Sequence, residues 1–237
     1  MIFRNFLFYL GLIPATILFA ILGTLFFFLP FKARYYLITR WSHFFIFWAK
    51  TTCGLRYKVT GKENIPTKNA IIFSNHQSMW ETIFMQVLFP TQCWVLKKEL
   101  LRIPVFGWGL ALLDPIAIDR KQFNSVKALI QQGKERLEKG RWVVIFPEGT
   151  RVLPNVNRPY SRSGAALAEA TGYPILPVAH NAGLYWPRGF FIKKPGTIRI
   201  VIGPVIEAKE KTATVLNKEA EHWIKNTLDI IVRRPPK

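Results

Sequence analysis

The sequence predicts an α/β domain with a mixed, mainly parallel β-sheet flanked by helices, preceded by a long apolar segment. From about residue 55, short apolar runs that suit buried strands alternate with stretches of helical periodicity. Polar clusters directly follow several of these runs, where loops of such sheets collect ligands. The first 50 residues are apolar and aromatic and contain no acidic residue. We therefore divide the chain into an N-terminal segment, 1–50, and an α/β domain, 51–237.

The N-terminal segment is long enough to cross a membrane. Residues 5–31 contain no charged side chain, and as a helix these 27 residues would be roughly 40 Å long, against roughly 30 Å of bilayer hydrocarbon. Pro14 lies inside the segment and predicts a kink, because proline removes a backbone donor. A kinked span and a shallow insertion of two helices therefore both remain open.

Residues 35–50 combine aromatic with basic side chains, which is typical of a helix at the membrane–water interface. A cleaved signal peptide is the competing interpretation, but the apolar stretch is longer than usual and no small-x-small cleavage site follows it. We expect residues 1–50 to form helices that anchor the chain in a membrane.

The basic residues also predict the orientation. Lys32, Arg34, Arg40 and Lys50 follow the apolar stretch, whereas only Arg4 precedes it. Because basic residues accumulate on the cytoplasmic side, we expect the α/β domain on the cytoplasmic face of the cell (inner) membrane.

The elements of the α/β domain follow from apolar runs and helical stripes. Strands are predicted at 70–73, 93–96, 115–118, 142–146, 175–179 and 198–202. Helices are predicted at 78–88, from 124 or 125 to 140, at 163–171 and at 207–232.

The charge balance indicates a polyanionic partner. The chain carries 33 basic and 14 acidic side chains, a net charge of +19. Nucleic acid, an anionic membrane or an acidic carrier protein would suit this excess, and a merely solvated basic surface is the plainer alternative. No zinc-ligand spacing or nucleic-acid-binding motif is present, so we expect neither a nucleic-acid partner nor a metal site.

The first polar cluster, residues 74–81, follows a predicted strand and opens a predicted helix. His76 and Glu81 are five positions apart, so the carboxylate can reach back to one imidazole nitrogen and leave the other as a general base. A histidine that merely packs at a strand end is the alternative. No Gly-x-Ser-x-Gly nucleophile motif is present, so such a base would activate a substrate hydroxyl directly.

The second polar cluster is Phe-Pro-Glu-Gly-Thr-Arg at 146–151, after the strongest predicted strand. It reads either as an ordinary Pro/Gly turn or as a loop that directs Arg151 into a cleft. A guanidinium suits phosphate because its planar donors match the phosphate oxygens.

Five motifs in order carry a family resemblance between about residue 70 and residue 180. They are Asn-His-x4-acid, Lys-Lys-Glu-Leu, Ile-Asp-Arg, Phe-Pro-Glu-Gly-Thr-Arg and Ile-Leu-Pro-Val-Ala. The set resembles the lysophosphatidic acid acyltransferase (1-acyl-sn-glycerol-3-phosphate acyltransferase) family. The resemblance implies a glycerolphosphate acyltransferase-like fold. It also implies transfer of a fatty acyl chain from acyl-CoA or acyl carrier protein to the sn-2 hydroxyl of lysophosphatidic acid, which gives phosphatidic acid.

The resemblance also implies residue roles. His76 would be the general base, held by Glu81 where the family usually has Asp. Arg151 would bind the substrate phosphate, with Lys97 or Lys98 assisting.

Further positions follow from the same motifs. Arg120 would take part in acceptor binding or else pair with a neighbouring acid, and Glu148, Gly149 and Thr150 would shape the acceptor site. No cofactor is implied beyond the thioester co-substrate. The implied partners are the phospholipid membrane, lysophosphatidic acid and acyl-CoA or acyl carrier protein.

Two alternatives remain at this point. The acceptor could be another lysophospholipid or a non-glycerol lipid. The chain could also be a non-catalytic protein that binds anionic membranes, although such a protein has no need of a held base.

Overall fold

The computed structural model describes residues 2–104, 106–119, 124–153, 156, 158–189 and 193–233. Its strands are β1 (Leu55–Thr60), β2 (Ile71–Ser74), β3 (Gln92–Lys97), β4 (Ile116–Ile118), β5 (Trp142–Ile145), β6 (Ile175–His180) and β7 (Gly196–Ile202). Its α-helices are α1 (Ile2–Leu25), α2 (Phe31–Cys53), α3 (Trp80–Leu88), α4 (Phe106–Leu112), α5 (Ser125–Glu138), α6 (Ser163–Thr171) and α7 (Ala213–Arg233). Short 3₁₀ turns are η1 (Lys62–Asn64), η2 (Lys98–Arg102) and η3 (Ala182–Leu184).

The described strands form one seven-stranded sheet in the order β1-β7-β6-β2-β5-β3-β4. Every neighbouring pair is parallel except β6 and β7, which are antiparallel. The prediction of a mixed, mainly parallel sheet is confirmed.

Each predicted strand and helix of the α/β domain has a counterpart, and the differences have local causes. The last helix begins at Ala213, later than the predicted 207. Strand β1 was not predicted, because it lies at the sheet edge and is largely exposed, so its sequence lacks a continuous apolar run. Helix α4 was missed because it is short and contains two glycines, which weaken a helical signal.

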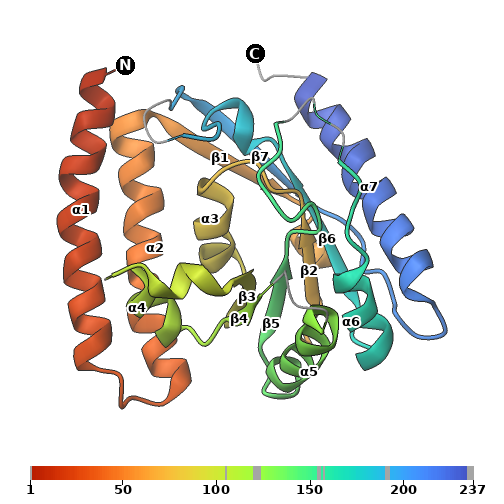
Figure 1. Ribbon diagram of the computed structural model, residues 1–237. Helices are drawn as coiled ribbons and strands as arrows, with labels where there is room; N and C mark the ends of the chain where they lie inside the picture. Colours follow the sequence, from red (N-terminus) through yellow and green to blue (C-terminus); the bar gives the residue numbers. More distant parts are fainter. Residues whose placement is uncertain are drawn as a thin grey trace.

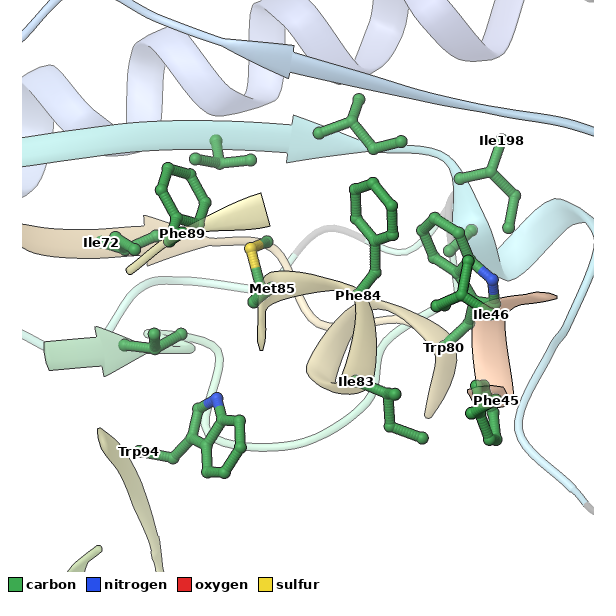
Figure 2. Packing of buried hydrophobic residues seen from close by; sticks show 14 of the residues in the cluster. Phe45, Ile46, Ile72, Trp80, Ile83, Phe84, Met85, Phe89, Trp94 and Ile198 are labelled. Atoms are coloured by element: carbon green, nitrogen blue, oxygen red, sulfur yellow. The ribbon is translucent and has the colours of Figure 1, made fainter. Parts of the chain in front are cut away.

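The sheet is covered by helices on both faces (Figure 1). Alternation along β2 shows how: Ile72 packs in the core layer with α1, α2 and α3, whereas Ile71 and Phe73 pack in the layer with α5, α6 and α7. Figure 2 shows Trp80, Phe84 and other side chains of α3 packed in the first layer. The fully buried β2 residues explain the purely apolar run in the sequence.

Helices α1 and α2 form an antiparallel hairpin beside the first core layer (Figure 1). Helix α1 continues through Pro14, and Phe3–Leu25 is the one stretch of the described chain long and apolar enough to cross a membrane. Tryptophans of α2 bind α1: the indole N–H of Trp48 donates to the Phe8 carbonyl and that of Trp41 to Thr16 Oγ1, both at 3.0 Å. Gly11 leaves the space that the Trp48 ring occupies.

Lys193 attaches the beginning of α1 to the β6–β7 connection. Its side chain is buried, and Nζ lies 3.2 Å from Asn5 Oδ1 and 3.1 Å from the Tyr9 hydroxyl. The rings of Phe8, Tyr9 and Trp186 surround it with centroids 4.3–4.6 Å from Nζ. Aromatic faces attract a desolvated ammonium by about 2 kcal/mol, so this contact stabilises the docked helix.

We predict that Lys193→Met releases the beginning of α1, because methionine keeps the apolar stem and removes the ammonium. Backbone amides of residues 5–12 should exchange with deuterium at least tenfold faster in detergent, while those of α5 stay unchanged. The control is Lys194→Met, since that neighbouring side chain is exposed. Equal exchange in both variants would show that the contact does not hold the helix.

Candidate active site

The two polar clusters meet because β2 and β5 are adjacent and parallel, so their carboxyl ends open at the same edge of the sheet. His76 follows β2, and 146–151 follows β5. Strand β3 lies on the other side of β5 and ends at Lys97. The topology thus collects three of the sequence motifs at one edge.

His76 and Glu81 form a hydrogen-bonded pair. Imidazole Nδ1 lies 2.8 Å from Glu81 Oε1, and the same oxygen accepts the backbone N–H groups of Gln77 and Ser78, both at 2.8 Å. Because a carboxylate only accepts, Nδ1 carries the proton and Nε2 keeps its lone pair for a substrate. The Glu81 side chain reaches the imidazole, although the family that the motifs resemble usually has aspartate at this position.

The carboxylate of Glu81 is buried, whereas His76 stays partly open, with 1% and 16% of the side chains exposed. Burial alone would raise the pKa of Glu81, but the imidazoles of His180 and His76 and the hydrogen bonds from His76 and Ser78 lower it below its ordinary value. The pair therefore presents an anionic carboxylate behind a reachable imidazole.

The 146–152 segment holds His76 from its backbone and its ring face. The His76 N–H donates to Glu148 Oε2 at 2.9 Å, and the Val152 N–H donates to the His76 carbonyl at 2.7 Å. The Phe146 ring stacks on the imidazole at 4.3 Å between centroids. Burial is the main cause that raises the pKa of Glu148, to about 7.

A buried pair of residues braces the strand ends below this site. The Asn75 side chain exchanges two hydrogen bonds with the backbone of His180, at 2.9 and 3.0 Å, and His180 Nε2 lies 2.7 Å from the Asn75 carbonyl. His180 Nδ1 accepts the Ala182 N–H at 3.3 Å. Burial lowers the pKa of His180, and both of its ring nitrogens contact the backbone, so this histidine is structural.

A cavity of about 560 Å³ opens beside His76. Its apolar part is enclosed by α1, α2, α3, β3 and α4 through side chains that include Phe19, Ile38, Ile83, Leu96 and Leu110. Among the described residues that line it, none is acidic, and three besides His76 are basic: Lys97, Arg151 and Arg188. The cavity therefore suits a molecule with a long apolar part and an anionic group.

Several of the residues predicted from the sequence line the cavity. They are His76, Lys97, Gly149, Thr150 and Arg151. Gly149 has φ of +71°, a conformation that glycine adopts readily, and this turn brings the following backbone to the cavity.

Glu148 and Lys98 were also predicted as site residues, but they do not line the cavity. Glu148 is not among the lining residues; it acts on the His76 backbone instead. Lys98 begins η2, is exposed and does not line the cavity. Arg120 falls outside the described residues.

The sequence analysis missed Arg188 and the contribution of α1. Arg188 lies in a Trp-Pro-Arg-Gly run in the connection after β6, well beyond the end of that strand at His180. No local signal in the sequence separates it from the other basic residues. Thr16, Phe19 and Ala20 of α1 line the cavity, and nothing in an apolar helix distinguishes lining residues from lipid-facing ones.

Comparison with known proteins identifies the family. Residues 56–181, which contain the His76–Glu81 pair and the 146–151 loop, match the family model described as Acyltransferase. This chain belongs to the acyltransferase family. It is an enzyme, and the alternative of a non-catalytic membrane-binding protein is not supported.

Similar proteins cover most of the chain. The 1-acyl-sn-glycerol-3-phosphate acyltransferase of Pseudomonas aeruginosa is 48% identical over 95% of this chain and 90% of that protein. The Helicobacter pylori enzyme of the same name is 35% identical over 55% of this chain and 58% of that protein. The crystal structure of the 1-acyl-sn-glycerophosphate acyltransferase of Thermotoga maritima shares the fold, with a TM-score of 0.82, 23% identity and coverage of 99% and 97% of the two chains.

We predict that Glu81→Gln lowers kcat by two to four orders of magnitude. The neutral amide no longer stabilises the imidazolium, and a general base is worth about that much. Steady-state kinetics would measure kcat and KM, and KM should change little because Glu81 is buried behind His76. A large increase in KM at unchanged kcat would contradict this role.

We predict that Glu148→Gln changes how stability depends on pH. The folded pKa of about 7 exceeds the ordinary 4.5, so folding favours the protonated carboxyl. The stability from this group is greatest below pH 4.5, and about 3 kcal/mol of it is lost as pH rises to 7. Glutamine does not ionise. The difference in melting temperature between Glu148→Gln and wild type should therefore increase as pH rises from 4.5 to 7.

Thermal unfolding in detergent at several pH values would measure this difference. The exposed Glu138→Gln serves as the control. A constant difference between Glu148→Gln and wild type across the range would show that Glu148 does not titrate there.

Proposed function

We propose that this acyltransferase moves a fatty acyl chain from acyl-CoA or acyl carrier protein to the sn-2 hydroxyl of lysophosphatidic acid, which gives phosphatidic acid. The observation that carries this proposal is the hydrogen-bonded His76–Glu81 pair beside a cavity that is lined by many apolar side chains and by the basic side chains of Lys97, Arg151 and Arg188. The name of the Pseudomonas aeruginosa relative supports the same acceptor.

The acceptor binds through its phosphate in this proposal. Arg151 and Lys97 line the cavity beside His76 and make no salt bridge with another described residue. A guanidinium and an ammonium together can satisfy several oxygens of a phosphate monoester. The absence of acidic side chains among the described lining residues leaves their attraction uncompensated until the substrate binds.

His76 carries the chemistry. Its Nε2 takes the proton of the sn-2 hydroxyl, and the oxygen forms a bond to the thioester carbonyl carbon. Glu81 stabilises the imidazolium through Nδ1. The carbon–sulfur bond then breaks, and the imidazolium returns the proton to the departing thiolate. Because the thioester supplies an activated acyl group, the reaction requires no cofactor.

The N-terminal hairpin places the cavity in the membrane surface in this proposal. One side of α1 exposes an apolar stripe whose members are 47–70% exposed: Phe3, Phe6, Leu10, Ile13, Ile17 and Ile21. Another side packs on α2 and lines the cavity, which favours a hairpin inserted into one leaflet over a helix that crosses the bilayer alone. The basic, acid-free segment 1–62 suits the anionic cytoplasmic face of the cell (inner) membrane.

We predict that purified protein in detergent makes phosphatidic acid from lysophosphatidic acid and an acyl thioester, and that His76→Ala lowers kcat at least a thousandfold. Thin-layer or mass-spectrometric detection of the product would measure both, with coenzyme A and carrier-protein thioesters offered separately. His222→Ala is the matched control, because that histidine is exposed on α7.

Two outcomes would contradict the proposal. Activity retained by a folded His76→Ala variant would remove the histidine from the mechanism. Wild-type activity with other lysophospholipids, but none with lysophosphatidic acid, would overturn the acceptor.

A further inference from the structure

A third permanent cation lines the reaction cavity without an assigned role. Arg188 belongs to the connection between β6 and β7 and is exposed. Its side chain makes no salt bridge or hydrogen bond with the other described residues. An uncompensated guanidinium in a substrate cavity is suited to an oxyanion.

Arg188 reaches the cavity from the connection after β6, whereas Arg151 and Lys97 come from the ends of β5 and β3. Strand β2, which His76 follows, lies between β6 and β5. Arg151 follows β5 and Lys97 ends β3, which is the next strand beyond β5. The strand order thus places His76 between the strand that leads to Arg188 and the strands that lead to the other two cations.

The described residues just before Arg188 are attached to the core. Two residues earlier, Trp186 is buried and packs on Phe45 and Phe8, with centroids 5.6 and 5.5 Å apart. The Gly183 N–H donates to Gln77 Oε1 at 3.0 Å, which ties the connection to the residue after His76. Arg188 therefore follows residues that are tied both to the core and to the residue next to His76.

The proposed reaction brings two phosphate-bearing molecules to His76. The acceptor carries a phosphate monoester, and coenzyme A and acyl carrier protein both attach the acyl chain through phosphopantetheine. Both molecules must place a reacting atom near the same imidazole nitrogen, and approach from separate sides of it keeps their anionic groups apart. One cluster of cations cannot hold both without bringing the two phosphates together, which like-charge repulsion disfavours.

We propose that Arg188 is a second anion-binding residue, which binds a substrate phosphate on the side of His76 opposite to Arg151 and Lys97. The inference rests on the proposed function. If Arg151 and Lys97 hold the acceptor, the phosphate at Arg188 belongs to the phosphopantetheine of the donor. If Arg151 and Lys97 instead hold the donor, the phosphate at Arg188 belongs to the acceptor.

Equilibrium binding tests this without requiring turnover. Full-length wild type and Arg188→Gln in detergent would be titrated with a non-hydrolysable thioether analogue of acyl-coenzyme A, and separately with lysophosphatidic acid. We expect Arg188→Gln to weaken one of the two ligands at least tenfold and the other less than twofold. Arg188→Lys should recover part of the loss, because it keeps the charge but not the planar donors.

Phosphate-free probes separate anion binding from a change in the loop. The acyl-pantetheine thioether and 1-acylglycerol lack the phosphate, so Arg188→Gln should leave their dissociation constants within twofold of wild type. Lys194→Gln, an exposed cation on the same connection, controls for net charge.

The outcomes are distinct. Selective weakening of the coenzyme A analogue supports the site with the donor as its ligand, and selective weakening of lysophosphatidic acid supports it with the acceptor. Unchanged affinity for both, or equal weakening of phosphate-bearing and phosphate-free probes, overturns the proposal. Failure of wild type to make phosphatidic acid would overturn the proposed function alone, because these dissociation constants are measured without reaction.

Discussion

His76 is held by two buried or partly buried glutamates, and the rest of the site is arranged around that histidine. Glu81 fixes the imidazole through Nδ1, and Glu148 fixes the backbone through the His76 N–H. The first comes from the beginning of α3 and the second from the loop after β5, so the parallel pairing of β2 and β5 is what makes the arrangement possible. A shift of either strand would separate the base from its carboxylate or from the Arg151 loop.

The cavity beside His76 exists because helices outside the family-matching region cover it. Residues 56–181 contain the His76–Glu81 pair and the 146–151 loop, whereas α1 and α2 supply much of the apolar wall. Helix α1 has no covalent link to the sheet except through α2, so its position depends on contacts such as Lys193 and Trp186. The cavity and the apolar N-terminal hairpin are therefore parts of one structure.

The large positive charge is divided between internal and substrate-facing positions. Arg136 and Arg141 bind Asp114, and Arg34 donates to the Leu112 carbonyl at 3.0 Å, so these guanidinium groups join α2, α4 and α5. Arg151, by contrast, faces the cavity without an acidic partner among the described residues. Net charge indicated an anionic partner, but only the structure separates the cations that hold the protein together from those left for a ligand.

The sequence alone determined the α/β class, six of the seven described strands and the two polar clusters that follow strands, because burial periodicity and residues after strands are local features. It did not reveal the edge strand β1, the lining residues of α1 or the place of Arg188. These depend on which strands become neighbours and how the hairpin docks, contacts between residues far apart in the chain. Glu148 shows the same division: its motif marked it as a site residue, yet only the fold decided that its carboxylate binds the His76 backbone and does not line the cavity.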